Sequence, residues 1–461
     1  MLEMFFIAGF TIVAVGLTIF LVRSLSLILA LHTLTFVLMT TAVQTASLAL
    51  EPRQYQIDIL LLLLALLGLY LLVIFLGAPV FKSLAGDTEE LLRAVVDMSP
   101  AGLCWLMVGG LAIKAYLLLK YGVVAFALLS TPEATIASVD AAVGALAIYP
   151  ATGAFWATTV VLGCVPGVAR RHPILFITWL LFFVWPLLGF GEVGGGRRFI
   201  MITVVLAALA AWAYRGYPVS VRVVAALAAL SIVTFSLLVY FQAIRTNFEP
   251  ETIAMLNSRD PGQMLTGIAR YLTPPTDAAG IFQENLRERS SPFGVLYDLT
   301  DQQVQRLERG GQVLAGGKII TQAVYNVIPR VALPTKETVN ADEVLAAVFD
   351  FPNVDLAAGL VAFAQAELFA LAYLVMPLVM VLLLGLYSRW FRRCAGWSLV
   401  LRTSVFSVLI STSMYVEAVP DTLLADARHL LLIGAVVVTV QPLFRLPASG
   451  ARPAPSGSTS V

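Results

Sequence analysis

Basic residues gather in two places along a largely apolar chain, and both arrangements suit the binding of a phosphate group. Gly194-Gly195-Gly196-Arg197-Arg198 opens a predicted helix near Phe199. Glycines let backbone N–H groups approach an anion at a helix start, and guanidinium groups bind phosphate oxygens bidentately. The second place is Val327-Ile-Pro-Arg330-Val-Ala-Leu-Pro-Thr-Lys336, where two prolines restrict the backbone around Arg330 and Lys336. Such stiffening limits the entropy lost when cations converge on a ligand.

These cations predict a site for a membrane-borne pyrophosphate, whose developing charge guanidinium groups would stabilise as it departs. Arg245, Arg270, Arg287 and Arg289 are among the further arginines of the polar segment that contains Arg330, at about residues 244–355. Two simpler interpretations stay open. Arg197 and Arg198 could be ordinary interface residues whose side chains reach toward water. The arginines of the segment could each be solvated or paired with a nearby acid.

Carboxylates near the second cluster are candidates for proton transfer from an acceptor hydroxyl. Glu367 lies in the predicted helix that follows the polar segment, where partial burial would favour its protonated form. Asp355 and Asp342 are competitors. The alternative for Glu367 is a structural brace to an arginine. Cys104, Cys164 and Cys394 are too scattered for a disulfide framework or thiolate metal site, and we expect no metal and no cofactor.

Composition places these residues in a membrane protein. The chain has 461 residues, of which 59% are hydrophobic and 12% are charged, whereas soluble proteins carry about a quarter charged residues. The net charge of +1 gives no reason to expect nucleic acid as a partner. About eleven stretches are apolar enough to cross the bilayer. Their predicted centres are Val13, Phe36, Gly68, Gly110, Ala154, Phe182, Val205, Ser231, Leu371, Leu409 and Ala435.

Basic residues in alternate loops predict the orientation of these helices. The alternate loops hold Arg23, the stretch 82–93, Arg170 with Arg171, Arg215 with Arg222, and the trio Arg389, Arg392 and Arg393. Because cytoplasmic loops are enriched in Lys and Arg, the N-terminus is predicted outside and the C-terminus inside. The predicted organisation is an all-α polytopic membrane protein with an N-terminal bundle (1–243), a large outer, periplasmic loop (244–356), C-terminal spans (357–444) and a disordered cytoplasmic tail (445–461).

The outer loop contains local helix signals. Thr300-Asp301-Gln302-Gln303 has capping-box spacing and predicts a helix start, and Gly310-Gly311 predicts its end. A second predicted helix has six apolar residues on one face, which would pack on the membrane portion or lie at its interface. These residues are Ile319, Ile320, Ala323, Val324, Val327 and Ile328.

Together these motifs resemble the O-antigen and oligosaccharide repeat-unit polymerases over approximately residues 191–385. The resemblance rests on the Gly-Arg-Arg helix opening, the late outer loop, the Ile328-Pro-Arg…Leu333-Pro-Thr-Lys336 string, and Asp355…Ala364-Gln-Ala-Glu367. It implies a membrane glycosyltransferase fold of the C type in the bacterial inner membrane. It also implies transfer of a growing glycan from undecaprenyl pyrophosphate to another lipid-linked repeat unit at the periplasmic face. A chain-length regulator would be a further partner, besides membrane lipids.

The residues that match the family's pattern are expected to contact the lipid pyrophosphate. They are Arg197, Arg198, Arg245, Arg289, Arg330 and Lys336, with Arg197, Arg330 and Glu367 as the catalytic candidates and Asp355 as a further substrate contact. The related O-antigen ligases depend on an outer-loop histidine. Residues 244–355 contain none, which disfavours that activity, and His429 near the outer end of the last predicted span is a weak catalytic candidate.

Two other functions stay open on the sequence. A C-type glycosyltransferase that uses a polyprenyl-phosphate sugar would place acids in its first outer loop, where Glu51 and Asp58 lie. A transporter or flippase for lipid-linked oligosaccharide would also bind pyrophosphate with basic residues. The long asymmetric outer segment and the lack of a visible internal repeat count against the transporter.

Overall fold

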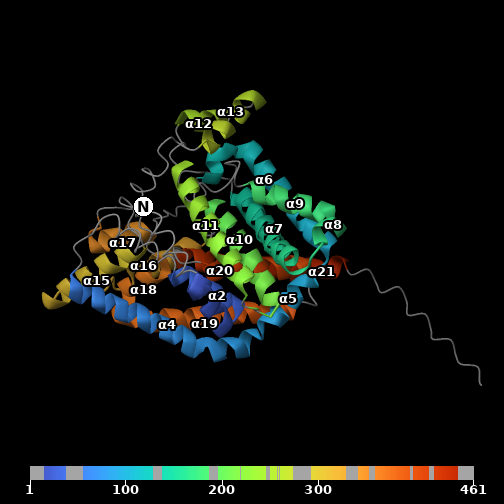
Figure 1. Ribbon diagram of the computed structural model, residues 1–461. Coiled ribbons are helices and arrows are strands. Elements are labelled where there is room, and N and C mark those ends of the chain that lie inside the picture. Colours follow the sequence, from blue (N-terminus) through green and yellow to red (C-terminus); the bar gives the residue numbers. More distant parts are fainter. Residues whose placement is uncertain are drawn as a thin grey trace, which may run out of the picture.

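A computed structural model shows a helical bundle with smaller helices gathered at its ends (Figure 1). The structure describes residues 15–37, 56–127, 138–185, 196–216, 218, 220–244, 250–256, 258, 260–273, 292–328, 341–351, 359–394, 398–414 and 420–444. No β-strand occurs among them, which confirms the predicted all-α class for this part of the chain.

Four described helical stretches are long and apolar enough to cross a membrane. They are Ile57–Ala85, Pro100–Leu117, Leu146–Cys164 and Gly359–Arg393. The first is α4, and the next two lie within α6 (Pro100–Ala127) and α7 (Ser138–Cys164). The fourth comprises α18 (Gly359–Leu368), the 3-10 turn η5 (Phe369–Leu371) and α19 (Ala372–Arg393). All predicted centres except Val13, which lies outside the described residues, fall within helical stretches, but the number of eleven spans stays a prediction.

The bundle contains further helices. They are α2 (Leu27–Val37), α8 (Val168–Arg171), α9 (Pro173–Val184), α10 (Gly196–Tyr214), α11 (Val221–Ile244), α20 (Leu399–Met414) and α21 (Pro420–Phe444). α7 packs against α6, α10 and α20, and α4 packs along α19. Small residues permit these close approaches. A Cβ on Gly77 would lie 3.0 Å from Val381 Cγ2, and one on Gly385 would lie 3.1 Å from Leu84 Cβ.

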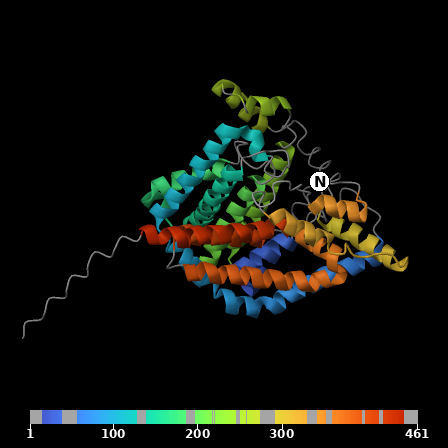
Figure 2. The same cartoon turned by 180° about the vertical axis from the view of Figure 1, so that it is seen from behind.

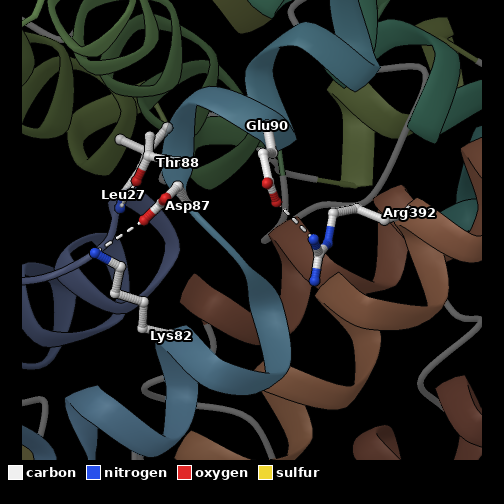
Figure 3. A network of polar contacts seen from close by, with 6 residues as sticks. All are labelled: Leu27, Lys82, Asp87, Thr88, Glu90 and Arg392. Atoms are coloured by element: carbon white, nitrogen blue, oxygen red, sulfur yellow. Dashed lines mark hydrogen bonds and ion pairs between the residues drawn. The ribbon is translucent and has the colours of Figure 1, made fainter.

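These two contacts show that α4 and α19 run in the same direction, because residue numbers rise together along both helices. At their C-terminal ends a polar network joins them to α5 (Thr88–Val96), as Figure 3 shows. Arg392 Nη1 lies 2.6 Å from Glu90 Oε2, and its Nη2 donates to Leu84 O at 3.0 Å. Lys82 Nζ lies 3.0 Å from Asp87 Oδ1. Two of the predicted basic loops therefore meet at one end of the bundle.

The other end of α4 carries part of the long polar segment. The backbone N–H of Gln56 donates to Tyr297 OH at 2.7 Å, and α15 (Pro292–Glu308) contacts both α4 and α18. Figure 1 shows α15, α16 (Lys318–Val327) and α17 (Ala341–Phe349) around this end of α4, with α5 at the opposite end. The polar helices and the basic loops are thus separated by the length of α4. This separation agrees with the predicted alternation of loops, and which side faces outward stays a prediction.

The helices described in the polar segment form two groups. α12 (Pro250–Leu256) and α13 (Pro261–Leu272) pack on each other, and α12 contacts α6. α15 contacts α4 and α18, whereas α16 contacts α17 and α21. Both views place α12 and α13 away from the other group (Figures 1 and 2).

The predicted start of a helix at Thr300 was wrong. α15 begins at Pro292, so Thr300 lies in mid-helix, where its Oγ1 donates to Leu296 O at 2.6 Å. The buried apolar residues Phe293, Leu296 and Leu299 explain the earlier start, because they anchor the first turns to the core. The predicted end was confirmed, since α15 stops at Glu308 and Gly310 has a φ of 69°.

Candidate functional site

Glu367 lies where the polar helices join the membrane bundle, and its carboxylate holds the start of α16. Its Oε2 accepts a hydrogen bond from the backbone N–H of Gly317 at 2.6 Å, and its Oε1 accepts from the N–H of Ile319 at 2.9 Å. Gly317 adopts a left-handed conformation with φ 83°, which turns the chain into the helix. A carboxylate is favoured there because the first N–H groups of a helix lack intrahelical partners and carry partial positive charge.

A backbone hydrogen bond reinforces this junction. The N–H of Ala315 donates to Ala366 O at 2.8 Å, so the last turn of α18 binds both the turn before α16 and its first N–H groups. Glu367 is 8% exposed, and both of its oxygens are engaged. The geometry therefore favours the bracing alternative over proton transfer, although the partners are backbone N–H groups rather than an arginine.

A fully buried polar network stabilises the same region. Gln365 Nε2 donates to Thr300 Oγ1 at 2.9 Å and to Gln303 Oε1 at 3.0 Å. Tyr373 OH donates to Gln365 Oε1 at 2.8 Å, and Gln303 Nε2 donates to Gln365 O at 3.0 Å. Each of these side chains is 0% exposed. Because buried polar groups are costly unless paired, the network fixes how α15, α18 and α19 fit together.

The chain is strained two residues after Glu367. Phe369 has a φ of 51°, which is unusual for a bulky residue, and it interrupts the helical run between α18 and α19. Such strained positions cost of order 1–3 kcal/mol and cluster at functional sites. Broken membrane helices also occur where transport and binding sites are built. The break therefore marks this junction as a functional candidate independently of the carboxylate.

The apolar face predicted for α16 consists of a buried row and an exposed row. Ile319 and Ala323 are buried, whereas Ile320 is 55% exposed, Val324 is 53% exposed and Ile328 is 39% exposed. The exposed residues are four apart and form one row along the helix. An exposed apolar row on a helix beside α21 suits contact with lipid.

Most predicted cationic contacts lie outside the described residues. Arg197 and Arg198 fall in the first turn of α10, where the backbone is helical as predicted, but their side chains are not described. Arg245, Arg287, Arg289, Arg330, Lys336 and Asp355 lie outside the described residues, as do Glu51 and the side chain of Asp342. Their convergence on one pocket stays a prediction. Arg330 follows two residues after Ile328, the last described residue beyond α16.

Two other predicted candidates have defined positions. Arg270 of α13 forms an ion pair with Glu251 of α12, with 3.0 Å between Nη1 and Oε2. The sequence left open that arginines of this segment are simply paired with nearby acids, and Arg270 is such a case. Exposed ion pairs of this kind contribute about 0–1 kcal/mol to stability. Asp58 lies in the first turn of α4, at the end of that helix near α15.

A second polar cluster lies between α7 and α21. Tyr149 OH donates to Asp426 Oδ1, and His429 Nδ1 lies 3.1 Å from Tyr149 OH. Arg428 Nη2 lies 3.1 Å from His429 Nε2. Of this group, only His429 was a candidate from the sequence. Asp426 and Arg428 could have been identified from the string Asp426-Ala-Arg-His429, because ionisable residues are uncommon inside an apolar predicted span. Tyr149 had no such signal, because its partners lie far along the chain.

Within the described part of the chain, no three His, Cys, Asp or Glu side chains gather as a metal site would require. Comparisons of the chain with models of protein families, with curated proteins and with solved structures gave no match. Function is therefore inferred from the chemistry and placement of the residues themselves.

Proposed function

We propose that this chain is a glycosyltransferase that joins undecaprenyl-pyrophosphate-linked oligosaccharide repeat units into a surface polysaccharide. The reaction would take place at the outer leaflet of a bacterial inner membrane. The observation that carries the proposal is the Glu367 junction. Glu367 accepts hydrogen bonds from the first turn of α16 at 2.6 and 2.9 Å, and Pro329, Arg330 and Lys336 follow α16 in the sequence. The two cations of this proline-containing stretch thus follow, in the sequence, a helix whose first turn is held in place.

The proposed chemistry needs no nucleotide sugar. A hydroxyl of the acceptor glycan bonds to C1 of the donor glycan, while the bond from C1 to the pyrophosphate oxygen breaks. The electron pair leaves with undecaprenyl pyrophosphate, and Arg197 and Arg330 stabilise the charge that develops there. Arg198, Arg245, Arg289 and Lys336 are proposed to hold the remaining phosphate oxygens, and Asp355 to contact the glycan. Guanidinium groups suit this role because two parallel N–H donors match two phosphate oxygens.

The position of α16 supports sideways access for a lipid-linked substrate. Its exposed row of Ile320, Val324 and Ile328 would lie against acyl chains at the membrane interface. Arg330, two residues further on, would then lie near the level of the lipid headgroups. A polyprenyl tail could stay in the bilayer while its pyrophosphate contacts the cations. In this account Glu367 is a positioning residue, because both of its oxygens are engaged with the start of α16.

The proposal is tested by polymer length in cells that carry single variants. Arg197→Ala and Arg330→Ala should each abolish chain lengthening, because the leaving pyrophosphate loses a fixed cation; losing one such donor costs roughly 100-fold or more in rate. Arg270→Ala is the matched control, since Arg270 lies in the same polar segment but pairs with Glu251 at 3.0 Å. The control should give normal polymers. All three proteins should reach the membrane in similar amounts, and normal polymers from both test variants would refute the assignment.

A further inference from the structure

The cluster between α7 and α21 forms a row of four side chains with one direction of hydrogen bonding. A guanidinium group can only donate, so Arg428 Nη2 donates to His429 Nε2 across 3.1 Å. The proton of the neutral imidazole is then on Nδ1, which donates to Tyr149 O at 3.1 Å. Tyr149 O–H in turn donates to Asp426 Oδ1. Each donor points along the row toward Asp426.

The same bundle contains a histidine–tyrosine pair that serves for comparison. His32 Nε2 lies 2.9 Å from Tyr70 OH, and His32 Nδ1 lies 3.3 Å from the carbonyl oxygen of Ser413. No carboxylate or guanidinium group takes part in these bonds, and a packing role explains them. The row between α7 and α21 also contains a histidine and a tyrosine. It differs by having Arg428 and Asp426 as well, and Asp426 is 3% exposed. Ionisable groups inside apolar helices are costly, so their presence suggests a function beyond packing.

The row lies on helices that pack against α16 and α10, the two helices next to the predicted cationic clusters in the sequence. α21 packs against α16, which precedes Arg330 in the sequence, and α7 packs against α10, which begins with Gly196-Arg197-Arg198. Gly163 and Cys164 at the C-terminal end of α7 lie against Ala207 and Ala210 in the C-terminal half of α10, which indicates that these packed helices run in the same direction.

Helix geometry sets the level of the row relative to the arginine pair. Arg197 lies ten residues before Ala207, or about 15 Å along α10 at ~1.5 Å per residue. Tyr149 lies fourteen residues before Gly163, or about 21 Å along α7 at the same rise. The start of α10 and the row are therefore within about two helical turns of each other along the bundle.

We propose that His429, Tyr149 and Asp426 form the proton relay of the transfer reaction, an inference that rests on the proposed function. Arg428 turns away from His429, and Nε2 takes the proton of the acceptor hydroxyl as its oxygen bonds to C1 of the donor. The Nδ1 proton passes to Tyr149, whose own proton passes to Asp426. The electron pair of the broken C1–O bond leaves with the pyrophosphate. After product release, the reverse path returns the proton from Asp426 to water through half-buried His429.

In this relay His429 is the catalytic residue, whereas Tyr149 and Asp426 act through it as positioning residues. The assignment supplies the base that Glu367 does not provide while it holds α16. General base catalysis contributes roughly 100- to 10,000-fold to a rate. An interruption of the row should therefore lower turnover strongly and substrate binding little.

The test compares Tyr149→Phe with Tyr70→Phe, because each removes one hydroxyl that bonds to a histidine. Lengthening of a lipid-linked repeat unit is measured at saturating and at limiting substrate, with thermal unfolding recorded for each variant. Tyr149→Phe should lower the rate at saturation by about 100-fold with little change in KM. Tyr70→Phe should keep the rate near that of the wild type. Asp426→Asn should resemble Tyr149→Phe, and Asp426→Glu should restore part of the rate.

The outcomes separate the relay from the reaction itself. A wild-type rate for Tyr149→Phe, or equal loss of rate in both phenylalanine variants with equal loss of stability, would overturn the relay alone. If the wild-type protein lengthens no lipid-linked glycan, both the proposed function and the relay are wrong. Should His429→Gln not fold, Tyr149→Phe still decides the matter, because it deletes a single oxygen atom.

Discussion

At the scale of single residues, the important features are carboxylates whose partners are fixed. Glu367 accepts two backbone N–H bonds and thereby connects α18 to the first turn of α16. Asp426 instead ends a row of groups that can exchange protons. These two acids lie in apolar helices and look alike in the sequence. Their partners distinguish a structural brace from a proposed proton acceptor.

Glu367→Gln should destabilise the protein by about 1–3 kcal/mol, because the buried N–H of Ile319 and the partly buried N–H of Gly317 lose a charged acceptor. Glu367→Asp should also lower the stability, since the shorter aspartate side chain does not reach both N–H groups. Glu308→Gln is the control, because Glu308 is exposed at the end of α15. Thermal unfolding in detergent measures the effect. A Glu367→Gln protein that unfolds like the wild type yet lengthens no glycan would return Glu367 to the role of proton donor or acceptor.

At the scale of helices, close approaches through small residues fix the bundle. A Cβ on Gly153 of α7 would collide with the backbone carbonyl of Thr403 in α20. Backbone atoms cannot move aside as the end of a flexible side chain can. The contact between α7 and α20 therefore requires glycine at this position, whereas the atoms nearest a Cβ on Gly77 or Gly385 belong to the side chains of Val381 and Leu84.

Gly153→Ala should destabilise the protein by at least about 1–3 kcal/mol, because overpacking forces the two helices apart. Gly68→Ala is the matched control, since Gly68 also lies in a long apolar helix but a Cβ added there would have nothing within 4 Å. The control should be neutral or up to about 1 kcal/mol more stable, because alanine favours the helix over glycine. Unfolding temperatures of the two purified variants measure the difference. Equal stability would contradict the proposed packing of α7 on α20.

The sequence predicted the long apolar helices well but not the details that depend on neighbours. Hydropathy located α4, α6, α7 and the stretch 359–393, because a membrane span leaves a strong local signal. The capping-box spacing at Thr300 misplaced the start of α15, since buried apolar residues upstream extend the helix. The sequence predicted the apolar face of α16. The division of this face into a buried and an exposed row depends on the neighbouring helices α17 and α21.

The candidate site shows the same limit. Glu367 was identified from its place in an apolar helix, whereas its partners are backbone N–H groups that carry no sequence signature. Tyr149 bonds to residues 277 and 280 positions away, which spacing along the chain does not reveal. The arginine pair at residues 197 and 198 was placed correctly at a helix start, because glycines before an apolar run are a local signal.

At the scale of the whole molecule, basic loops and polar helices lie at opposite ends of α4. Arg392, Glu90, Lys82 and Asp87 form the network at one end, and Tyr297 bonds to Gln56 at the other. Since cytoplasmic loops are enriched in Lys and Arg, we infer that α15, α16 and α17 face the periplasm.

Cysteine labelling tests this orientation. Arg309→Cys, in the exposed turn after α15, should react with a membrane-impermeant maleimide in intact spheroplasts. Lys82→Cys, whose native side chain is 69% exposed at the other end, should react only after lysis. The wild-type protein serves as the blank, because Cys164 and Cys394 are buried and Cys104 is partly buried. Labelling of both variants in intact spheroplasts, or the reverse pattern, would contradict the orientation.

The central claim is that the protein joins whole lipid-linked repeat units, and reconstitution tests it most directly. The purified protein is placed in vesicles, and an undecaprenyl-pyrophosphate-linked repeat unit is supplied on the leaflet that the polar helices face. We predict a ladder of products spaced by complete repeat units, together with released undecaprenyl pyrophosphate. Addition of single sugars from a polyprenyl-phosphate donor, or movement of the substrate across the membrane without any longer product, would contradict it.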